Sequence, residues 1–246
     1  MTTFEQALET VTKEYGRRVD NDPTALLQQV GHHLAELHGK MLRPKLVLLA
    51  TATANEADIA APRTILLATA TEMLHNASLL HDDVVDDSPY RRGQPSANSQ
   101  WGNRTAILAG DFFLAQIMLL MEEVGDRQAT RKMAETVADM TRGELIQMQC
   151  QNSAPNRDTY ATITRCKTAS LMATCCYYGN PTLETFGLHY GMAFQLRDDI
   201  DDNEATPFTA EMLDTEVSLA IAELDKIKSS PFVQELRSMT NKLINK

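Results

Sequence analysis

The sequence contains few residues of the kinds that interrupt helices or crosslink chains. Its 246 residues include 11 glycines, 9 prolines and 4 cysteines. This scarcity, together with abundant Leu, Ala, Met, Glu and Gln, favours helix over sheet. Cys175 and Cys176 are adjacent, which is poor geometry for a structural disulfide, and the sequence contains no CxxC pair. We therefore expect reduced thiols that pack as small hydrophobic side chains.

Long hydrophobic runs and an excess of positive charge are also absent. Uninterrupted runs of about 18 apolar residues do not occur, and residues 1–18 carry charges throughout. We expect neither a transmembrane helix nor a secretory signal, and hence a cytoplasmic protein. The net charge of -10 opposes binding to nucleic acid, so no nucleic-acid partner is expected. An acidic protein can still bind an anionic substrate through divalent cations and a few local Arg or Lys residues.

Apolar residues recur at helical spacing along almost the whole chain. With 43% hydrophobic residues, the chain can bury one sizeable core, and we predict a single all-α domain over residues 1–246. Glycine and proline between residues 88 and 103 predict a polar loop. The expected helices cover residues 3–18, 23–38, a stretch from about 43, 62–87, 103–124, 128–151, 158–178, 182–202, and two shorter stretches on either side of 229–231.

Four aspartates end the predicted helix 62–87, in the stretch His81 to Asp87 with the sequence HDDVVDD. Asp82 and Asp86 are four residues apart and therefore share one helix face. These carboxylates repel one another and lie at the negative end of the helix dipole. A solvated acidic helix end is one interpretation. The other is a cation site, since Mg²⁺ prefers carboxylate oxygens alongside substrate phosphates.

A second acidic cluster, Asp198-Asp199-Ile200-Asp201-Asp202, repeats the DDxxD spacing at the end of another apolar helix. Two helix ends share the same unfavourable design. This repetition favours two facing halves of one metal site over a chance repeat. Metal ions held by both clusters could bind a diphosphate and neutralise the charge that develops as it leaves.

Basic residues accompany the acidic clusters. Arg91 and Arg92 follow the first cluster, and guanidinium groups bind phosphate oxygens in a bidentate manner. Lys40 and Arg43 stand at a predicted helix start, where free N–H groups favour anions. Lys167 interrupts an apolar helical stretch and could reach a phosphate. Each of these residues alone is a weak signal, because a basic pair on a surface is usually just solvated.

Together these motifs resemble the trans-polyprenyl diphosphate synthase family. The resemblance covers residues 39–202 and implies the isoprenoid synthase fold, an antiparallel helical bundle around a deep central cavity. It also implies a homodimer, with peripheral membrane contact for product release. The matching stretches are Gly39-Lys40, Arg43-Pro44, His81 to Asp87, Arg91-Arg92-Gly93, Gly110-Asp111, Lys167-Thr168-Ala169, and Phe194-Gln195 before the second DDxxD.

The reaction that this resemblance implies joins isopentenyl diphosphate to an allylic diphosphate. The allylic diphosphate ionises to a carbocation, the double bond of isopentenyl diphosphate attacks it, and pyrophosphate takes the released proton. About three Mg²⁺ ions would serve each active site, with Mn²⁺ as a substitute. The implied metal ligands are Asp82, Asp86 and Asp198, supported by Asp83, Asp199 and Asp202.

The resemblance also assigns the diphosphate-binding residues. Arg91, Lys167 and Gln195 would contact the allylic diphosphate, and Thr168 would orient Lys167 or help to bind the allylic group. His75 lies seven residues before Asp82, on the same helical stripe, although alone it would be taken for a satisfied core histidine. The residues implied for isopentenyl diphosphate are Lys40, Arg43, His75 and Arg92. The implied catalytic set is Asp82, Asp83, Asp86, Lys167, Gln195 and Asp198.

Small residues before the first cluster bear on product length. Ser78 and Ala77 lie four and five residues before Asp82, at a level where short-chain relatives tend to carry bulky aromatics. Because both residues are small, the cavity should stay open at this level. One helical turn rises about 5.4 Å, close to the length of one isoprene unit, so the sequence predicts a product of more than about three units. Alternatively, Ala77 is only a helix-packing residue. Candidates for the cavity floor are Met73, Leu74, Phe112, Phe113 and Gln116.

The sequence departs from the family after the second cluster. Relatives usually carry a loop with Gly and Lys there, followed by further helices, whereas here Asn203 to Pro207 lead directly to a predicted helix containing residues 211–224. The basic residues expected to cover the diphosphate are missing. A non-catalytic or partner-dependent subunit of a heteromeric synthase is therefore the main alternative. A class I terpene cyclase fits less well, because it would normally replace the second DDxxD.

Overall fold

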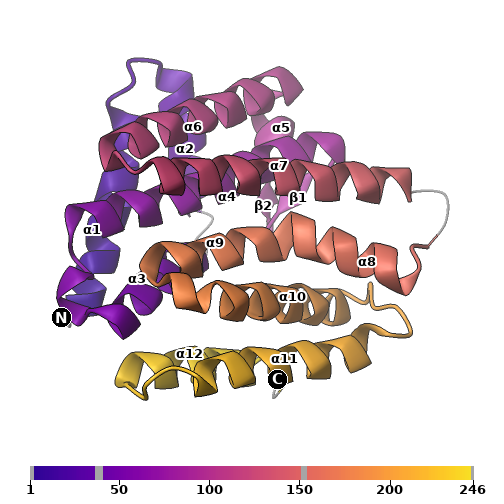
Figure 1. Ribbon diagram of the computed structural model, residues 1–246. Coiled ribbons are helices and arrows are strands. Elements are labelled where there is room, and N and C mark those ends of the chain that lie inside the picture. The colour runs from indigo at the N-terminus through magenta and orange to yellow at the C-terminus, as the bar shows by residue number, and fades with distance from the viewer. Residues whose placement is uncertain (1–2, 37–40, 151–153, 245–246) are drawn as a thin grey trace. The chain divides into compact units, whose positions relative to one another are not determined.

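The computed structural model describes residues 3–36, 41–150 and 154–244 and confirms the all-α class (Figure 1). The helices are α1 (Thr3–Asp20), α2 (Ala25–Glu36), α3 (Leu42–Ala54), α4 (Pro62–Val85), α5 (Ala97–Trp101), α6 (Asn103–Val124), α7 (Arg127–Gln149), α8 (Arg157–Thr164), α9 (Ser170–Gly179), α10 (Glu184–Asp201), α11 (Thr209–Asp225) and α12 (Pro231–Asn241). Short 3₁₀ turns, η1 (Glu56–Asp58) and η3 (Pro181–Leu183), a π turn, η2 (Arg165–Ala169), and two strands, β1 (Tyr90–Arg91) and β2 (Gln94–Pro95), complete it.

The chain forms two compact units. The first unit comprises residues 1–45 and 59–126, and the second comprises residues 46–58 and 127–246. The prediction of one domain over the whole chain stays a prediction. Each unit contains one of the two acidic clusters.

In the first unit, α4 packs against α1 and α6, and α5 packs against α6. Pro62 begins α4 at a position where its missing N–H is not needed. Most of α4 is then buried, including Leu67 and Leu80. Tyr15 of α1 stacks on Phe113 of α6 at 5.8 Å between ring centroids. The apolar α4 thereby presents its acidic C-terminal end from a rigid core.

Helix α6 has an apolar face that the first unit does not cover. By length and mean hydropathy α6 could cross a bilayer, but 39% of its most apolar window is buried within the structure, and a core helix passes the same test. The exposed part includes Leu108 at 66% exposure and Met118 at 72%. The uncovered apolar stripe consists of Ile107, Leu108, Met118 and Leu119.

The helices of the second unit lie in layers, with α9 beside α7 and α10, and α11 on the other side of α10 (Figure 1). Helix α12 packs on α11. Close approach of α10 depends on Gly191, because an added Cβ there would lie 2.6 Å from Cα of Ala169. Strong 3.6-residue periodicity explains why α6 and α10 lie close to their predicted positions.

Two regions differ from the sequence prediction. The expected helix 158–178 is divided into α8, the π turn η2 and α9. The expected polar loop 88–103 contains an antiparallel hairpin and the short α5, with Tyr90 opposite Pro95 and Arg91 opposite Gln94. Arg92 and Gly93 form its turn with φ values of 51° and 79°, the sign that two-residue hairpin turns require.

Candidate active-site clusters

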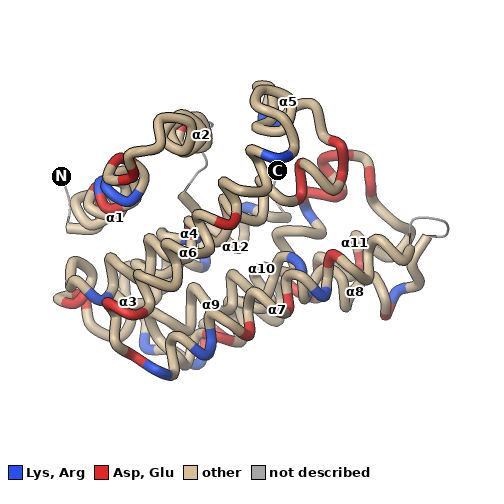
Figure 2. Tube along the Cα trace, turned by 90° about the horizontal axis from the view of Figure 1, so that it is seen from above, with Lys and Arg blue, Asp and Glu red and all other residues tan. Residues whose placement is uncertain are grey.

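The first cluster is held to its surroundings by its second aspartate. Asp83 is 3% exposed and accepts a hydrogen bond of 2.9 Å from Nε of Arg91, whose Nη2 is also paired with it. Asn98 of α5 donates to the backbone oxygen of Asp83 at 3.0 Å. Asp82 is half-buried and Asp86 is exposed. The hairpin and α5 are therefore fixed to the end of α4, and acidic positions gather close to α5 in Figure 2.

This arrangement gives Asp83 and Arg91 an internal partner each. The predicted contact of Arg91 with an allylic diphosphate, and the supporting metal role of Asp83, stay predictions. Lys40 lies outside the described residues. Sequence spacing indicated which aspartates share a face, but gave no signal that Asp83 would turn inward.

Two buried polar side chains lie on α4, about two to three turns before the first cluster. His75 Nε2 and Glu72 Oε2 are buried and make no hydrogen bond within the described part of the chain. Burial holds the pKa of His75 well below its usual range, and the charges of Arg43, Arg92 and Arg91 lower it further. Burial raises the pKa of Glu72, while Arg43 and Arg92 oppose that rise. His75 is therefore neutral beside basic residues.

Glu72 is a residue that the sequence analysis missed. With Tyr15, Asn76 and Arg92 it lines a cavity of about 240 Å³ in the first unit, and Asn76 donates to the Tyr15 hydroxyl at 2.9 Å. An acidic residue inside an otherwise apolar helical stretch was the available signal, because a buried carboxylate requires nearby positive charge.

The second cluster follows the same plan as the first. Asp199 is 9% exposed and accepts hydrogen bonds from the Tyr160 hydroxyl and, at 2.7 Å, from Nε2 of Gln195. Oε1 of Gln195 accepts a bond of 2.7 Å from Thr168. Asp198 is half-buried and Asp202 is exposed. Burial and the adjacent Asp199 raise the pKa of Tyr160, so the phenol remains a donor.

Lys167 lies in the π turn η2 and points to α7. Its Nζ is 2.5 Å from Oε2 of Glu144 and 3.3 Å from Oε1 of Gln147. An added Cβ at Gly143 would lie 2.6 Å from the backbone nitrogen of Lys167, so only glycine allows this approach. π turns inside helices frequently mark functional sites. The sequence analysis missed Glu144 and Gln147, because contacts between helices leave no local pattern.

The structure thus assembles the predicted residues by unit. Lys167, Thr168, Gln195 and the second cluster lie together in the second unit, and the first cluster lies with Arg91 in the first. Among the described residues, groups of three or more His, Cys, Asp or Glu side chains arranged for a metal do not occur. In both clusters the second aspartate is bonded internally, whereas the first is half-buried and the last exposed. Carboxylate oxygens of this kind suit Mg²⁺ whose remaining coordination positions are filled by substrate phosphates.

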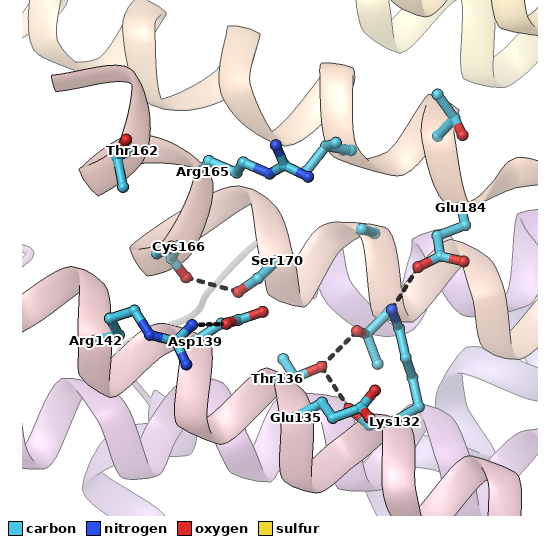
Figure 3. Close-up of a pocket in the computed structure, with 14 residues that line it drawn as sticks. Lys132, Glu135, Thr136, Asp139, Arg142, Thr162, Arg165, Cys166, Ser170 and Glu184 are labelled. Atoms are coloured by element: carbon cyan, nitrogen blue, oxygen red, sulfur yellow. Dashed lines mark hydrogen bonds and ion pairs between the residues drawn. The ribbon is translucent and has the colours of Figure 1, made fainter. Parts of the chain in front are cut away.

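The second unit also contains a cavity of about 600 Å³ between α7, α9 and α10, which Figure 3 shows in close-up. Four of its charged side chains pair within it, Lys132 with Glu184 and Arg142 with Asp139. Ser170 donates to the Cys166 backbone oxygen at 2.7 Å. None of the residues predicted for the active site lines this cavity.

Comparison with known proteins identifies the family. The polyprenyl synthetase family matches residues 24–212. The chain is 36% identical to an all-trans-nonaprenyl-diphosphate synthase (geranyl-diphosphate specific) of Rhodobacter capsulatus over 189 residues, 72% of this chain and 57% of that relative. It is 32% identical to heptaprenyl diphosphate synthase component 2 of Bacillus subtilis over 231 residues, 87% of this chain and 65% of the relative.

The fold agrees with this match. The crystal structure of a decaprenyl diphosphate synthase from Rhodobacter capsulatus superposes with a TM-score of 0.88 at 25% identity, covering 98% of this chain and 96% of the other. The chain spans less than two thirds of the length of the two sequence relatives named above. The match includes both acidic clusters, and the chain belongs to the polyprenyl synthetase family.

Proposed function

We propose that the protein is a prenyltransferase that condenses isopentenyl diphosphate with an allylic diphosphate into a trans-polyprenyl diphosphate. The observation that carries this proposal is the doubled cluster design, in which Asp83 and Asp199 are bonded internally while neighbouring carboxylates are more accessible. Such carboxylates are costly at helix ends unless a cation binds there. Names of the relatives, nonaprenyl and heptaprenyl diphosphate synthase, support the same reaction class.

We assign separate metal-binding and substrate-binding roles to the predicted residues. Asp82, Asp86 and Asp198 would hold Mg²⁺, which would neutralise the charge on a departing diphosphate. Lys167 and Gln195 bind the allylic diphosphate; Thr168 bonds to Gln195 and so fixes its amide. Arg43, His75, Arg92 and Lys40 bind isopentenyl diphosphate. Because burial keeps His75 neutral, it offers one N–H donor and adds no charge.

The test is turnover by the purified protein with Mg²⁺, isopentenyl diphosphate and geranyl diphosphate, with products separated by length. Linear products of more than about three units are expected. Cyclised hydrocarbon would instead identify a terpene cyclase.

A partner-dependent subunit is the second candidate. One relative is named component 2 of its synthase, and residues 203–208 after Asp202 contain neither Lys nor Arg, where the family resemblance implies a basic loop. Turnover that appears only when a second protein is added would establish this candidate and overturn self-sufficient catalysis.

Separate sites for the two substrates lead to a prediction about KM. Replacing Arg92 with Lys keeps the charge but removes the planar fork, so the KM for isopentenyl diphosphate should rise about tenfold. Lys167→Ala should instead raise the KM for the allylic substrate by a similar factor. Steady-state kinetics with each substrate varied in turn measures both. Equal effects of each variant on both KM values would contradict the division.

We also propose that the protein is a homodimer that pairs through the apolar stripe of α6. The exposed side chains fall in two adjacent pairs, Ile107 with Leu108 and Met118 with Leu119. The pairs are eleven residues apart, about three helical turns, so both lie on one face of α6. Apolar patches of this kind on soluble proteins mark association surfaces.

Charge placed in this stripe should therefore yield a monomer. Light scattering is expected to give a dimer mass for the native chain and a monomer mass for a Leu108→Glu, Met118→Glu double variant, because buried unpaired charge is unfavourable. Leu219→Glu, at an exposed leucine of α11, is the control and should remain dimeric. A monomeric native chain would refute this interface.

Product release completes the proposal. We propose that the protein works in the cytoplasm. Because a polyprenyl chain is apolar, we also propose that the protein contacts a membrane peripherally when the product is released. The net charge of -10 opposes lasting adhesion to anionic lipid.

A further inference from the structure

A continuous chain of hydrogen bonds crosses the second unit from α8 to the π turn. The Tyr160 hydroxyl donates to Oδ2 of Asp199, and Oδ1 of Asp199 accepts from Gln195 at 2.7 Å. Gln195 then accepts from Thr168, which is adjacent to Lys167, at 2.7 Å. An ionised carboxylate can only accept. Asp199 therefore fixes which way the Gln195 amide points, with NH₂ toward the carboxylate and the oxygen toward Thr168.

Tyr160 is in turn held by the short segment that follows the second cluster. The Phe208 ring packs edge-on against the Tyr160 ring, with centroids 5.5 Å apart. The backbone N–H of Glu204 donates to the backbone oxygen of Asp199 at 2.7 Å. Thr209 is fully buried, and its hydroxyl lies 2.7 Å from the hydroxyl of Thr206 in the same segment. The segment 203–209 thus packs directly on the group that holds Asp199.

We infer that Tyr160 and Asp199 are positioning residues, which transmit the packing of the segment 203–209 to Gln195 and Thr168. Both oxygens of Asp199 are occupied by protein donors, so Asp199 orients Gln195 and does not ligate the metal. This inference rests on the proposed function, because Gln195 and Lys167 are the groups assigned to the allylic diphosphate.

The first test removes one hydroxyl at a time. Tyr160→Phe keeps the ring and its contact with Phe208 but frees one oxygen of Asp199. The matched control is Tyr178→Phe, whose hydroxyl is also buried and donates to the Ala129 backbone oxygen at 2.9 Å in the same unit. Loss of the positioning bond should raise the KM for the allylic substrate about five- to tenfold, with the KM for isopentenyl diphosphate within about twofold. The control should leave both KM values within about twofold.

The second test measures metal binding without turnover. Mn²⁺ is titrated in the presence of inorganic diphosphate and its binding is followed by electron paramagnetic resonance. Asp199→Asn should bind Mn²⁺ within about threefold of the native chain, whereas Asp198→Asn should bind it at least about tenfold more weakly.

Each outcome decides the matter. The positioning role would be overturned if Tyr160→Phe gave the same two KM values as Tyr178→Phe. It would also be overturned if Asp199→Asn weakened Mn²⁺ binding as much as Asp198→Asn does. Absence of turnover by the native chain with both substrates would refute the proposed function instead. The Mn²⁺ titration would still show whether Asp199 is a ligand, and absence of Mn²⁺ binding by the native chain would refute both ideas.

Discussion

Asp82→Ala and Asp198→Ala should each lower kcat about 10²- to 10³-fold while leaving helix content unchanged. Each variant removes a carboxylate assigned to Mg²⁺, and losses of preorganised electrostatic stabilisation fall in this range. Folding should survive, because neither side chain is part of the buried core and removing charge from an acidic helix end relieves repulsion. Steady-state kinetics at saturating Mg²⁺ and circular dichroism of each variant measure the two quantities.

Asp201→Ala supplies a matched control within the second cluster. Asp201 is exposed and pairs with Arg197 one turn earlier, outside the DDxxD spacing. We expect its kcat to stay within about threefold of the native value, since an exposed i, i+4 ion pair contributes little. Near-normal rates for Asp82→Ala and Asp198→Ala would show that the metal assignment is wrong. An equal loss of kcat in all three variants would show that activity depends on the total negative charge of the clusters and not on specific metal ligands.

Helical periodicity predicted the fold well where helices are long. The boundaries of α6 coincide with the predicted range 103–124, and α10 begins two residues later and ends one residue earlier than the predicted range 182–202. The hairpin and α5 were missed, because strands of two residues and a helix of five residues are shorter than the windows that reveal periodicity. The positive φ of Arg92 has no sequence signal either, since arginine rarely adopts it.

Contacts between helices account for the other differences. The π turn at Lys167 lies against Gly143 of α7, and no pattern within residues 158–178 predicts that approach. Likewise, spacing placed Asp198 and Asp202 on one face, but could not predict that Asp199 would meet Tyr160 from α8. Sequence therefore predicted the residue types of the candidate site. Which carboxylates are bonded internally depends on tertiary packing.

Ala77→Tyr is expected to shorten the product to three or four isoprene units with little loss of the first condensation. Ala77 lies on α4, five residues before Asp82, and the growing chain is proposed to pass alongside this helix. A phenol ring at that level would cap the path of the chain after the first additions, since one helical turn matches about one isoprene unit. The native product should exceed three units. Separation of products by chain length, after incubation with excess isopentenyl diphosphate, measures the shift.

Close packing around Ala77 means that a bulky side chain there could also lower the stability of the protein. Ala77 is only 1% exposed, so a ring that found no cavity would be overpacked and would destabilise the protein by about 1–3 kcal/mol. A thermal melt of the variant therefore accompanies the product assay. Ser78→Ala is the control, because it removes the 2.8 Å bond from the Ser78 hydroxyl to the His75 backbone oxygen without adding bulk, and should leave product length unchanged. A stable Ala77→Tyr enzyme with native product lengths would show that the chain does not pass this residue. A native product of three units would place the floor of the cavity elsewhere.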